Sequence, residues 1–268
     1  MSVFSSSIAL PAIVARLRAA GCVFAEDEAE LLVTTAPTAA ALDAMIERRV
    51  AGEPLEHVLG WAGFCGLRVA VEPGVFVPRP RTEFLIQQAV ALARQVEGTP
   101  VVLDMCCGTG AMAAALAAGL ERAELHAADL DPAAVRCARR NLAGARVYEG
   151  DLYAPLPASL RGRVDILIAS PPYVPSESVG LLPPEARLHE PLMALDGGGD
   201  GLDVVRRLIA GAPGWLAPGG HLLVETSERQ AAATVAAVAE TGLAARAAGS
   251  DELDATAVIG TLGKAPTP

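Results

Sequence analysis

The ten residues from Val101 to Gly110 read VVLDMCCGTG and predict a short buried strand, a glycine-bearing loop and the start of a helix. Further strand and helix signals alternate along the chain after this segment. Strands that alternate with helices at this interval indicate a parallel sheet with right-handed crossovers. The sequence therefore predicts an α/β domain, with helices at 111–118 and 133–142 and strands at 101–103, 123–128 and 146–148.

Acidic residues follow three successive predicted strands, at Asp104, Asp129 and Asp151. The carboxyl ends of parallel strands form the edge of the sheet where ligands bind. A carboxylate at Asp129 can accept from both hydroxyls of a ribose, and Asp151 can accept from an adenine amino group. Acidic groups would repel a pyrophosphate but suit a neutral or cationic nucleoside. The pattern therefore favours S-adenosylmethionine, which carries a sulfonium.

A second motif, Ser170-Pro171-Pro172-Tyr173, directly follows the apolar run 164–169. Two prolines must end the strand, because proline has no N–H to donate to the sheet. An NH₂ group can donate one hydrogen to Ser170 Oγ and one to the Pro171 carbonyl, while the Tyr173 ring lies across its plane. Both contacts strengthen as the nitrogen becomes cationic. The motif therefore predicts the amino-group pocket of an N-methyltransferase.

The rest of the chain surrounds this domain with smaller segments. We expect an N-terminal helical subdomain over 1–58, a β-hairpin linker over 59–80 and the S-adenosylmethionine-binding domain over 81–268. Thr82 is placed to cap a helix over 84–96, and a long loop is predicted between Tyr173 and Gly201. The remaining elements are predicted as a helix at 202–210, a turn at 218–220, a strand at 221–225, a helix at 230–241 and strands at 244–248 and 256–261.

Composition narrows the possible functions. The net charge is −10 and the pI is about 4.9, which argues against a protein that grips nucleic acid by its phosphates. Five cysteines form no C-x-x-C pair, and no histidine lies at metal-ligand spacing. The start of the chain lacks a cationic segment typical of a signal peptide, and no apolar run approaches the length of a membrane span. We therefore expect a soluble cytoplasmic protein that uses no metal and binds no membrane.

These motifs together resemble the HemK/PrmC family of protein-(glutamine-N5) methyltransferases. The resemblance covers roughly residues 54–230, with the motifs in the family's order, and the combination is more specific than any one motif. It rests on Gly60, Phe64, Phe76-Val77-Pro78-Arg79-Pro80, Thr82-Glu83, the Asp104–Gly110 loop, Asp129, Ser170–Tyr173, Glu190-Pro191, Ala194-Leu195, Gly197-Gly198 and Asp200-Gly201-Leu202.

The resemblance implies a class I methyltransferase: a Rossmann-like, seven-stranded and mostly parallel sheet with a small N-terminal helical subdomain. It implies S-adenosylmethionine as methyl donor, S-adenosylhomocysteine as product, and as acceptor a glutamine in a protein such as a release factor or a ribosomal protein. By position, the catalytic pocket is Ser170, Pro171, Pro172 and Tyr173. The implied donor site is Phe76, Val77, Pro78, Arg79, Asp104, Cys106, Gly108, Gly110, Asp129, Leu130, Asp151, Leu152 and Ser170.

The sequence departs from the family pattern at three positions. Ser170 stands where the family usually has Asn, Cys106 where it has Gly, and Arg81 where it has Glu. These departures indicate a divergent paralogue. Two alternatives stay open at this point: an amino-methyltransferase of nucleic acid, acting on cytosine N4 or adenine N6, and a non-catalytic S-adenosylmethionine-binding protein associated with translation.

Overall fold

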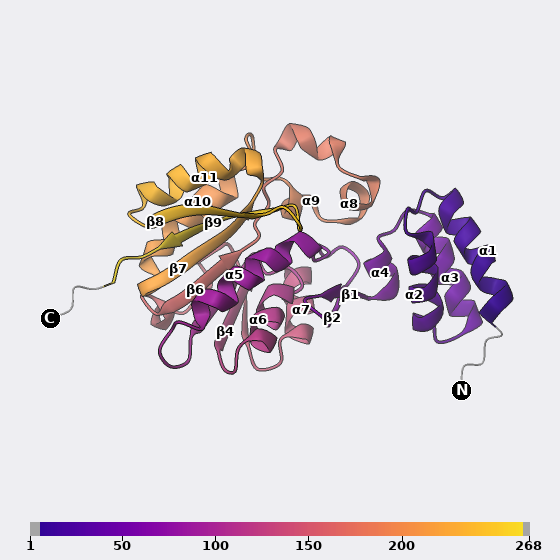
Figure 1. Cartoon of the computed structure of the whole chain (residues 1–268), viewed down its shortest axis with the longest axis horizontal. Helices are drawn as coiled ribbons and strands as arrows, with labels where there is room; N and C mark the ends of the chain where they lie inside the picture. The colour runs from indigo at the N-terminus through magenta and orange to yellow at the C-terminus, as the bar shows by residue number, and fades with distance from the viewer. Residues whose placement is uncertain (1–5, 265–268) are drawn as a thin grey trace.

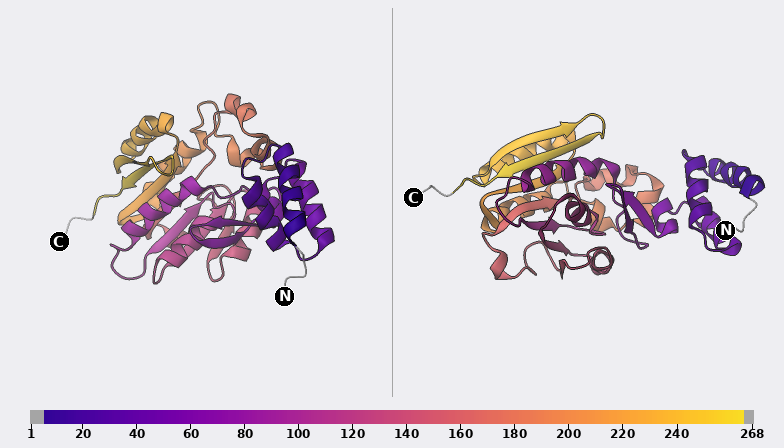
Figure 2. Two further views of the ribbon diagram at one scale, coloured as in Figure 1. Left: turned by 45° about the vertical axis from the view of Figure 1, so that its right-hand side comes forward. Right: turned by 60° about the horizontal axis from the view of Figure 1, so that its bottom comes forward.

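The computed structural model describes residues 6–264 and shows two parts, a bundle of helices near the N-terminus and an α/β domain (Figure 1). The bundle lies at the end of the molecule opposite the C-terminal strands in every view (Figure 2). It has its own core, which includes Leu17, Ala29, Leu32 and Ile46. Within residues 6–264, no helix is long and apolar enough to cross a membrane. The helices of this part are α1 (Ser6–Ala19), α2 (Ala25–Thr35), α3 (Ala39–Val50) and α4 (Leu55–Leu59).

A two-stranded hairpin joins the bundle to the α/β domain. Strands β1 (Trp61–Phe64) and β2 (Leu67–Ala70) pair antiparallel around a turn at Cys65 and Gly66, both of which have positive φ. Asn141 exchanges hydrogen bonds with both backbone polar groups of Ala70, which holds the hairpin against the domain. The predicted boundary between the helical subdomain and the hairpin linker, after residue 58, falls inside helix α4. This division of the chain stays a prediction.

The α/β domain is built on a seven-stranded sheet of order β5-β4-β3-β6-β7-β9-β8. The first five strands are parallel, and β9 pairs antiparallel with both β7 and β8. This arrangement confirms the predicted fold class. The strands are β3 (Val101–Met105), β4 (Glu124–Asp129), β5 (Arg146–Glu149), β6 (Val164–Ala169), β7 (Leu216–Thr226), β8 (Ala244–Ser250) and β9 (Ala255–Thr261).

Helices cover both faces of the sheet, as the continuous apolar strands require. Ile166 and Ile168 of β6 pack with α5 and α6, while Leu167 and Ala169 face the side covered by α10 and α11. Successive residues of a strand point to opposite faces, so one short sequence supplies both cores. The helices are α5 (Glu83–Ala93), α6 (Ala111–Gly119), α7 (Pro132–Asn141), α10 (Asp203–Gly211) and α11 (Glu228–Glu240).

The segment from Tyr173 to Gly201 is not the continuous loop that its Pro and Gly content predicts. It contains a 3-10 helix (Ser176–Leu181) and two short helices, α8 (Pro184–His189) and α9 (Leu192–Leu195). Prolines mark the helix starts here: Pro175, Pro183 and Pro191 are N-cap residues, and Pro184 lies in the first turn of α8, where its missing N–H costs nothing. We call residues 174–201 the strap.

Two local predictions are wrong. The Thr82 side chain does not cap α5, because its hydroxyl donates instead to Glu225 Oε2 at 2.5 Å. The predicted turn at 218–220 lies within the bounds of β7, which starts at Leu216, and it forms an irregular stretch where the pairing with β6 jumps from Leu216 to His221. Gly219 adopts φ +85° in this strand. Both errors come from partners that are far away in the sequence.

Candidate active site

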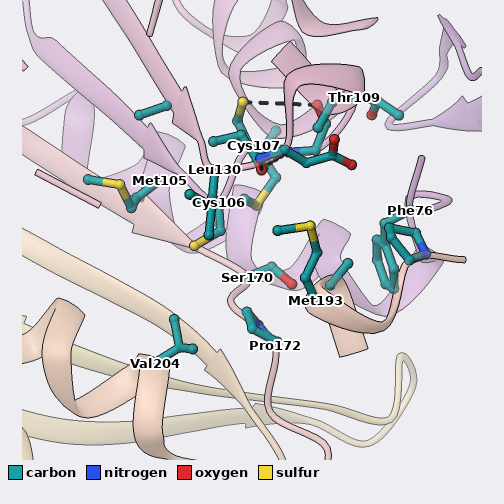
Figure 3. Close-up of a pocket in the computed structure, with 18 of the residues that line it drawn as sticks. Phe76, Met105, Cys106, Cys107, Thr109, Leu130, Ser170, Pro172, Met193 and Val204 are labelled. Carbon is teal, nitrogen blue, oxygen red and sulfur yellow. Dashed lines mark hydrogen bonds between the residues drawn. The ribbon is translucent and has the colours of Figure 1, made fainter. Parts of the chain in front are cut away.

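A cleft, here called the main cleft, opens at the carboxyl ends of β3, β4 and β6 (Figure 3). It encloses about 1060 Å³ of empty space together with its mouth, which is about the upper limit for small-molecule sites. Eleven predicted site residues line it: Phe76, Pro78, Arg79, Cys106, Gly108, Asp129, Leu130, Asp151, Leu152, Ser170 and Pro172.

The other predicted site residues lie elsewhere. Pro171 and Tyr173 line a neighbouring depression, here called the side hollow. Val77, Asp104 and Gly110 are buried and line neither space. Ligand contact at these three residues stays a prediction.

The loop after β3 turns sharply to bring backbone to the cleft. Cys106, Gly108 and Gly110 have φ of +57°, +53° and +77°. L-residues with side chains rarely adopt such values, which explains why the related family usually has glycine where this chain has Cys106. A Cβ atom at Gly110 would lie 2.8 Å from Leu142 Cδ1. The positive φ and this crowding by Leu142 together favour glycine at position 110.

Asp129 ends β4 and holds the loop in place. Its Oδ2 accepts from Gly108 N at 2.8 Å, and its Oδ1 accepts from Asp131 N at 2.9 Å. Burial raises the pKa of this carboxyl group, and the backbone donors oppose the shift. A carboxylate has about four lone-pair sites, so Asp129 keeps acceptor capacity toward the cleft.

Asp151 and Leu152 follow β5 at the far side of the cleft. Asp151 Oδ2 accepts from Arg207 Nη2 at 2.5 Å, and both side chains are about half exposed. Arg207 lies on α10 and also lines the cleft. Sequence reasoning missed Arg207, because an arginine in an amphipathic surface helix carries no signal of a site.

Asp104 lies within β3, not in the loop that follows it, and its side chain is fully buried. Oδ2 accepts from Ala113 N at 3.0 Å, whereas Oδ1 has no partner among the described residues. Burial, with a smaller contribution from the charge of Asp129, raises the pKa of Asp104 to about 8. The folded protein therefore favours the neutral acid at this position.

We expect Asp104 to make the stability of the protein fall as pH rises. Its pKa in the folded state, about 8, lies above the ordinary value of 3.8. The stabilisation is therefore complete below about pH 4 and is lost as pH rises toward 8. The loss is at most on the order of 5 kcal/mol. Urea unfolding of wild type and Asp104→Asn across this range tests it; parallel curves for the two proteins would contradict it.

Ser170 stands at the junction of the main cleft and the side hollow, and it lines both. Figure 3 shows its hydroxyl directed into the main cleft, toward the side where Met193 lies. No hydrogen bond joins Ser170 Oγ to another residue of the described range 6–264. The hydroxyl is therefore available to a ligand that bridges the two spaces.

Distant residues fix the backbone and ring of Tyr173. Gln230 Nε2 donates to the Tyr173 carbonyl at 2.9 Å, and the phenol donates to Glu225 Oε1 at 3.1 Å. Gln230 lies at the start of α11 and Glu225 at the end of β7. Nothing in their local sequence marks them as site residues, so sequence reasoning missed both.

The segment Phe76–Arg79 forms the wall shared by both spaces. Arg79 lies over the Phe76 ring, with Cζ 4.8 Å from the ring centroid, and Arg79 Nη2 donates to both oxygens of Glu190 at 2.6 Å. Glu190 Oε1 also accepts from Val77 N at 3.1 Å. Burial raises the pKa of Glu190, while the charge of Arg79 opposes the shift. Glu190 thus fastens the strap to the wall.

The fastened strap adds apolar residues to the main cleft. Met193 and Ala194 of α9 line the cleft together with Pro191, which directly precedes this helix. Met193 lies between Ser170 and Phe76 in Figure 3. Its side chain was not predicted as part of the site, because long-range contacts such as the Arg79–Glu190 ion pair place the strap beside the cleft.

The residues of the main cleft fit S-adenosylmethionine. Asp129 and Asp151 offer acceptors for ribose hydroxyls and for an adenine amino group. Leu130, Leu152 and Val204 provide apolar surface suited to a base between them. The carboxylates also suit a cationic sulfonium. The predicted donor therefore agrees with the chemistry of the cleft.

Comparisons with known proteins agree with this fold and cleft. The Methyltransferase small domain family matches residues 66–186. A solved methyltransferase of Pyrococcus furiosus superposes with a TM-score of 0.54 at 18% sequence identity, covering 74% of this chain and 90% of that one. At this identity the likeness concerns the fold alone.

Curated relatives are more similar in sequence. A release factor glutamine methyltransferase of Streptomyces coelicolor is 42% identical over 69% of this chain and 67% of the relative. One of Mycolicibacterium smegmatis is 39% identical over 89% and 85%. A 4-amino-L-phenylalanine/4-methylamino-L-phenylalanine methyltransferase of Streptomyces pristinaespiralis is 40% identical over 74% and 69%.

The fold and the main cleft define a class I S-adenosylmethionine-dependent methyltransferase. The curated relatives identify the family within this class, because they are about 40% identical over most of the chain. The chain belongs to the HemK/PrmC family of release factor glutamine methyltransferases, as its motifs predicted.

Proposed function

We propose that this enzyme methylates the side-chain amide nitrogen (N5) of a glutamine in a protein, and that the acceptor is a peptide chain release factor. One observation carries the proposal: Ser170 lines both the main cleft and the side hollow. An amide entering through the side hollow would meet the donor's methyl group beside Ser170. The names of the two release factor relatives supply the acceptor class.

The residues of the junction would align and polarise the acceptor. When bound, S-adenosylmethionine supplies the reactive methyl group at its sulfonium. Ser170 Oγ and the Pro171 carbonyl can each accept one hydrogen of the amide NH₂, and the Tyr173 ring packs across the amide plane. Both acceptors bind an amide that is becoming cationic more strongly than a neutral one, which lowers the barrier. The remaining rate enhancement comes from the alignment of the acceptor nitrogen with the donor methyl group.

A free aromatic amine is the second candidate acceptor. The Streptomyces pristinaespiralis relative is 40% identical and is named for 4-amino-L-phenylalanine. Ser170 is shorter than the Asn usual in the family and leaves more room beside the motif. An amino group needs the same two hydrogen-bond acceptors as an amide. The family resemblance also implies a ribosomal protein as a source of the glutamine. We expect no stable nucleic-acid binding, given the net charge of −10.

The test presents labelled S-adenosylmethionine and purified enzyme with one acceptor at a time, followed by mass spectrometry. The acceptors are a release factor, the same factor with its acceptor glutamine changed to glutamate, 4-amino-L-phenylalanine and DNA. We expect one methyl group on the glutamine of the first and none on the second. Label on the amino acid alone would establish the second candidate, and no label on any acceptor would contradict the proposed activity.

We place this activity in the cytoplasm. All five cysteines are free thiols, and three of them are buried. Disulfide-free chains with this many cysteines are typical of reducing compartments. Fractionation of the native host, with detection of the enzyme in the cytosolic fraction, tests this assignment.

A further inference from the structure

Glu225 is a buried carboxylate that the reaction outlined above does not use. It lies at the carboxyl end of β7, beside the end of β6 that carries the Ser170 motif. Glu225 is only 5% exposed and lines neither the main cleft nor the side hollow. Burying a carboxylate costs several kcal/mol unless partners compensate. Its partners therefore indicate what it does.

Three donors from two different walls converge on this one carboxylate. Thr82 Oγ1 donates to Oε2 at 2.5 Å, and Tyr173 OH donates to Oε1 at 3.1 Å. Arg81 Nε lies 3.7 Å from Oε1 and supplies a compensating charge. Thr82 lines the main cleft, whereas Tyr173 lines the side hollow. Glu225 thus bridges the wall of the donor space and the wall of the acceptor space.

We propose that Glu225 is a positioning residue for methyl transfer, which holds the Tyr173 ring at a fixed angle and distance from the Thr82 wall of the main cleft. The inference deepens the proposed function and rests on it for its kinetic consequence. A carboxylate accepts at both oxygens, so neither hydroxyl can turn away without losing a charge-assisted hydrogen bond. The Glu225 carboxylate then fixes the acceptor wall relative to the donor wall. A small displacement of the acceptor from the donor methyl group lowers the rate strongly.

The chemistry of Tyr173 agrees with this role. Burial, followed by the charge of Glu225, raises the pKa of the Tyr173 phenol. The phenol therefore stays protonated at neutral pH and keeps its proton for Glu225. Gln230 Nε2 donates to the Tyr173 carbonyl at 2.9 Å. Because Gln230 fixes the backbone of Tyr173, Glu225 determines the position of the hydroxyl end of its ring.

Glu225→Gln is the decisive variant, because it keeps the size of the side chain but offers only one oxygen. One of the two hydroxyls must then face an NH₂ group that cannot accept. We expect kcat to fall about 30-fold while the affinity for S-adenosylmethionine changes less than about threefold. Glu228→Gln is the matched control, because Glu228 is an exposed acid three residues further on, and the hydrogen bond of the Tyr173 phenol goes to Glu225. It is expected to leave kcat unchanged.

A double-mutant cycle with Tyr173→Phe shows whether Glu225 acts through the ring. If it does, Glu225→Gln adds little to the loss in a Tyr173→Phe background, since the hydroxyl is already absent. Losses that multiply in the double variant would overturn the proposal. So would a Glu225→Gln enzyme whose defect lies wholly in donor affinity.

A second readout is independent of turnover. The chain has three tyrosines, so protein labelled with 3-fluorotyrosine gives few ¹⁹F resonances, and Tyr173→Phe assigns one of them. We expect Glu225→Gln to shift or broaden the Tyr173 resonance alone, with Tyr148 and Tyr153 unchanged. An unchanged Tyr173 resonance would overturn the proposal. If wild type methylated no acceptor, the proposed function would fail, while this spectrum would still decide whether Glu225 positions the ring.

Discussion

Asp129→Ala is expected to weaken the binding of S-adenosylmethionine by about 100-fold, since hydrogen bonds to a charged group contribute about 1.5–3 kcal/mol each. Two effects combine in this variant. The donor loses its carboxylate partner for the ribose hydroxyls, and the loop loses the acceptor that holds Gly108 N at 2.8 Å. Isothermal titration calorimetry of the two proteins measures the change in Kd directly.

Two further variants make this measurement specific. Asp129→Asn keeps an oxygen for Gly108 N but removes the charge, so we expect an intermediate loss. Glu149→Ala removes an exposed carboxylate from the position opposite Asp129 on β5, outside the main cleft. It is expected to leave Kd unchanged. Equal losses in Asp129→Ala and Glu149→Ala would mean that general charge, and not the carboxylate of Asp129, binds the donor.

Ser170→Ala is expected to lower kcat on the true acceptor by about 100-fold, comparable to the loss of one preorganised polar group at a reacting centre. The affinity for S-adenosylmethionine is expected to change little, because the proposed partner of the hydroxyl is the acceptor amide at the junction of the two spaces. Single-turnover rates with saturating donor, together with calorimetry, separate the two quantities.

Ser170→Asn and Ser176→Ala are the comparison variants. Asn restores the amide usual in the family, and we expect it to keep or raise turnover on a protein glutamine. Ser176 lies in the strap, where its hydroxyl donates to Asp196 at 2.6 Å outside both spaces, so Ser176→Ala is expected to stay close to wild type. Unchanged turnover in Ser170→Ala would rule out the hydrogen-bonding role of the hydroxyl.

Local sequence did not show the hydrogen-bond partners that the fold gives to Thr82 and Asp104. Thr82 has the spacing of a helix cap, yet its hydroxyl binds Glu225, 143 positions away. Asp104 precedes a glycine-bearing loop and was expected to face a ligand. In the fold, it is buried within β3, where it accepts from Ala113 N. A local sequence pattern shows the residue type and its neighbours in the chain. It does not show whether a side chain at a strand end faces the ligand or is buried in the domain.

The sequence alone determined the α/β fold, the strand ends that carry Asp129 and Asp151, and the Ser170 motif after β6. Each follows from short-range physics: apolar runs form buried strands, and prolines and glycines end them. Only the tertiary structure brought Glu190 to Arg79, Arg207 to Asp151 and Glu225 to Tyr173. Such contacts depend on how the crossovers and the strap fold back over the sheet, and no local pattern encodes which distant side chains then meet.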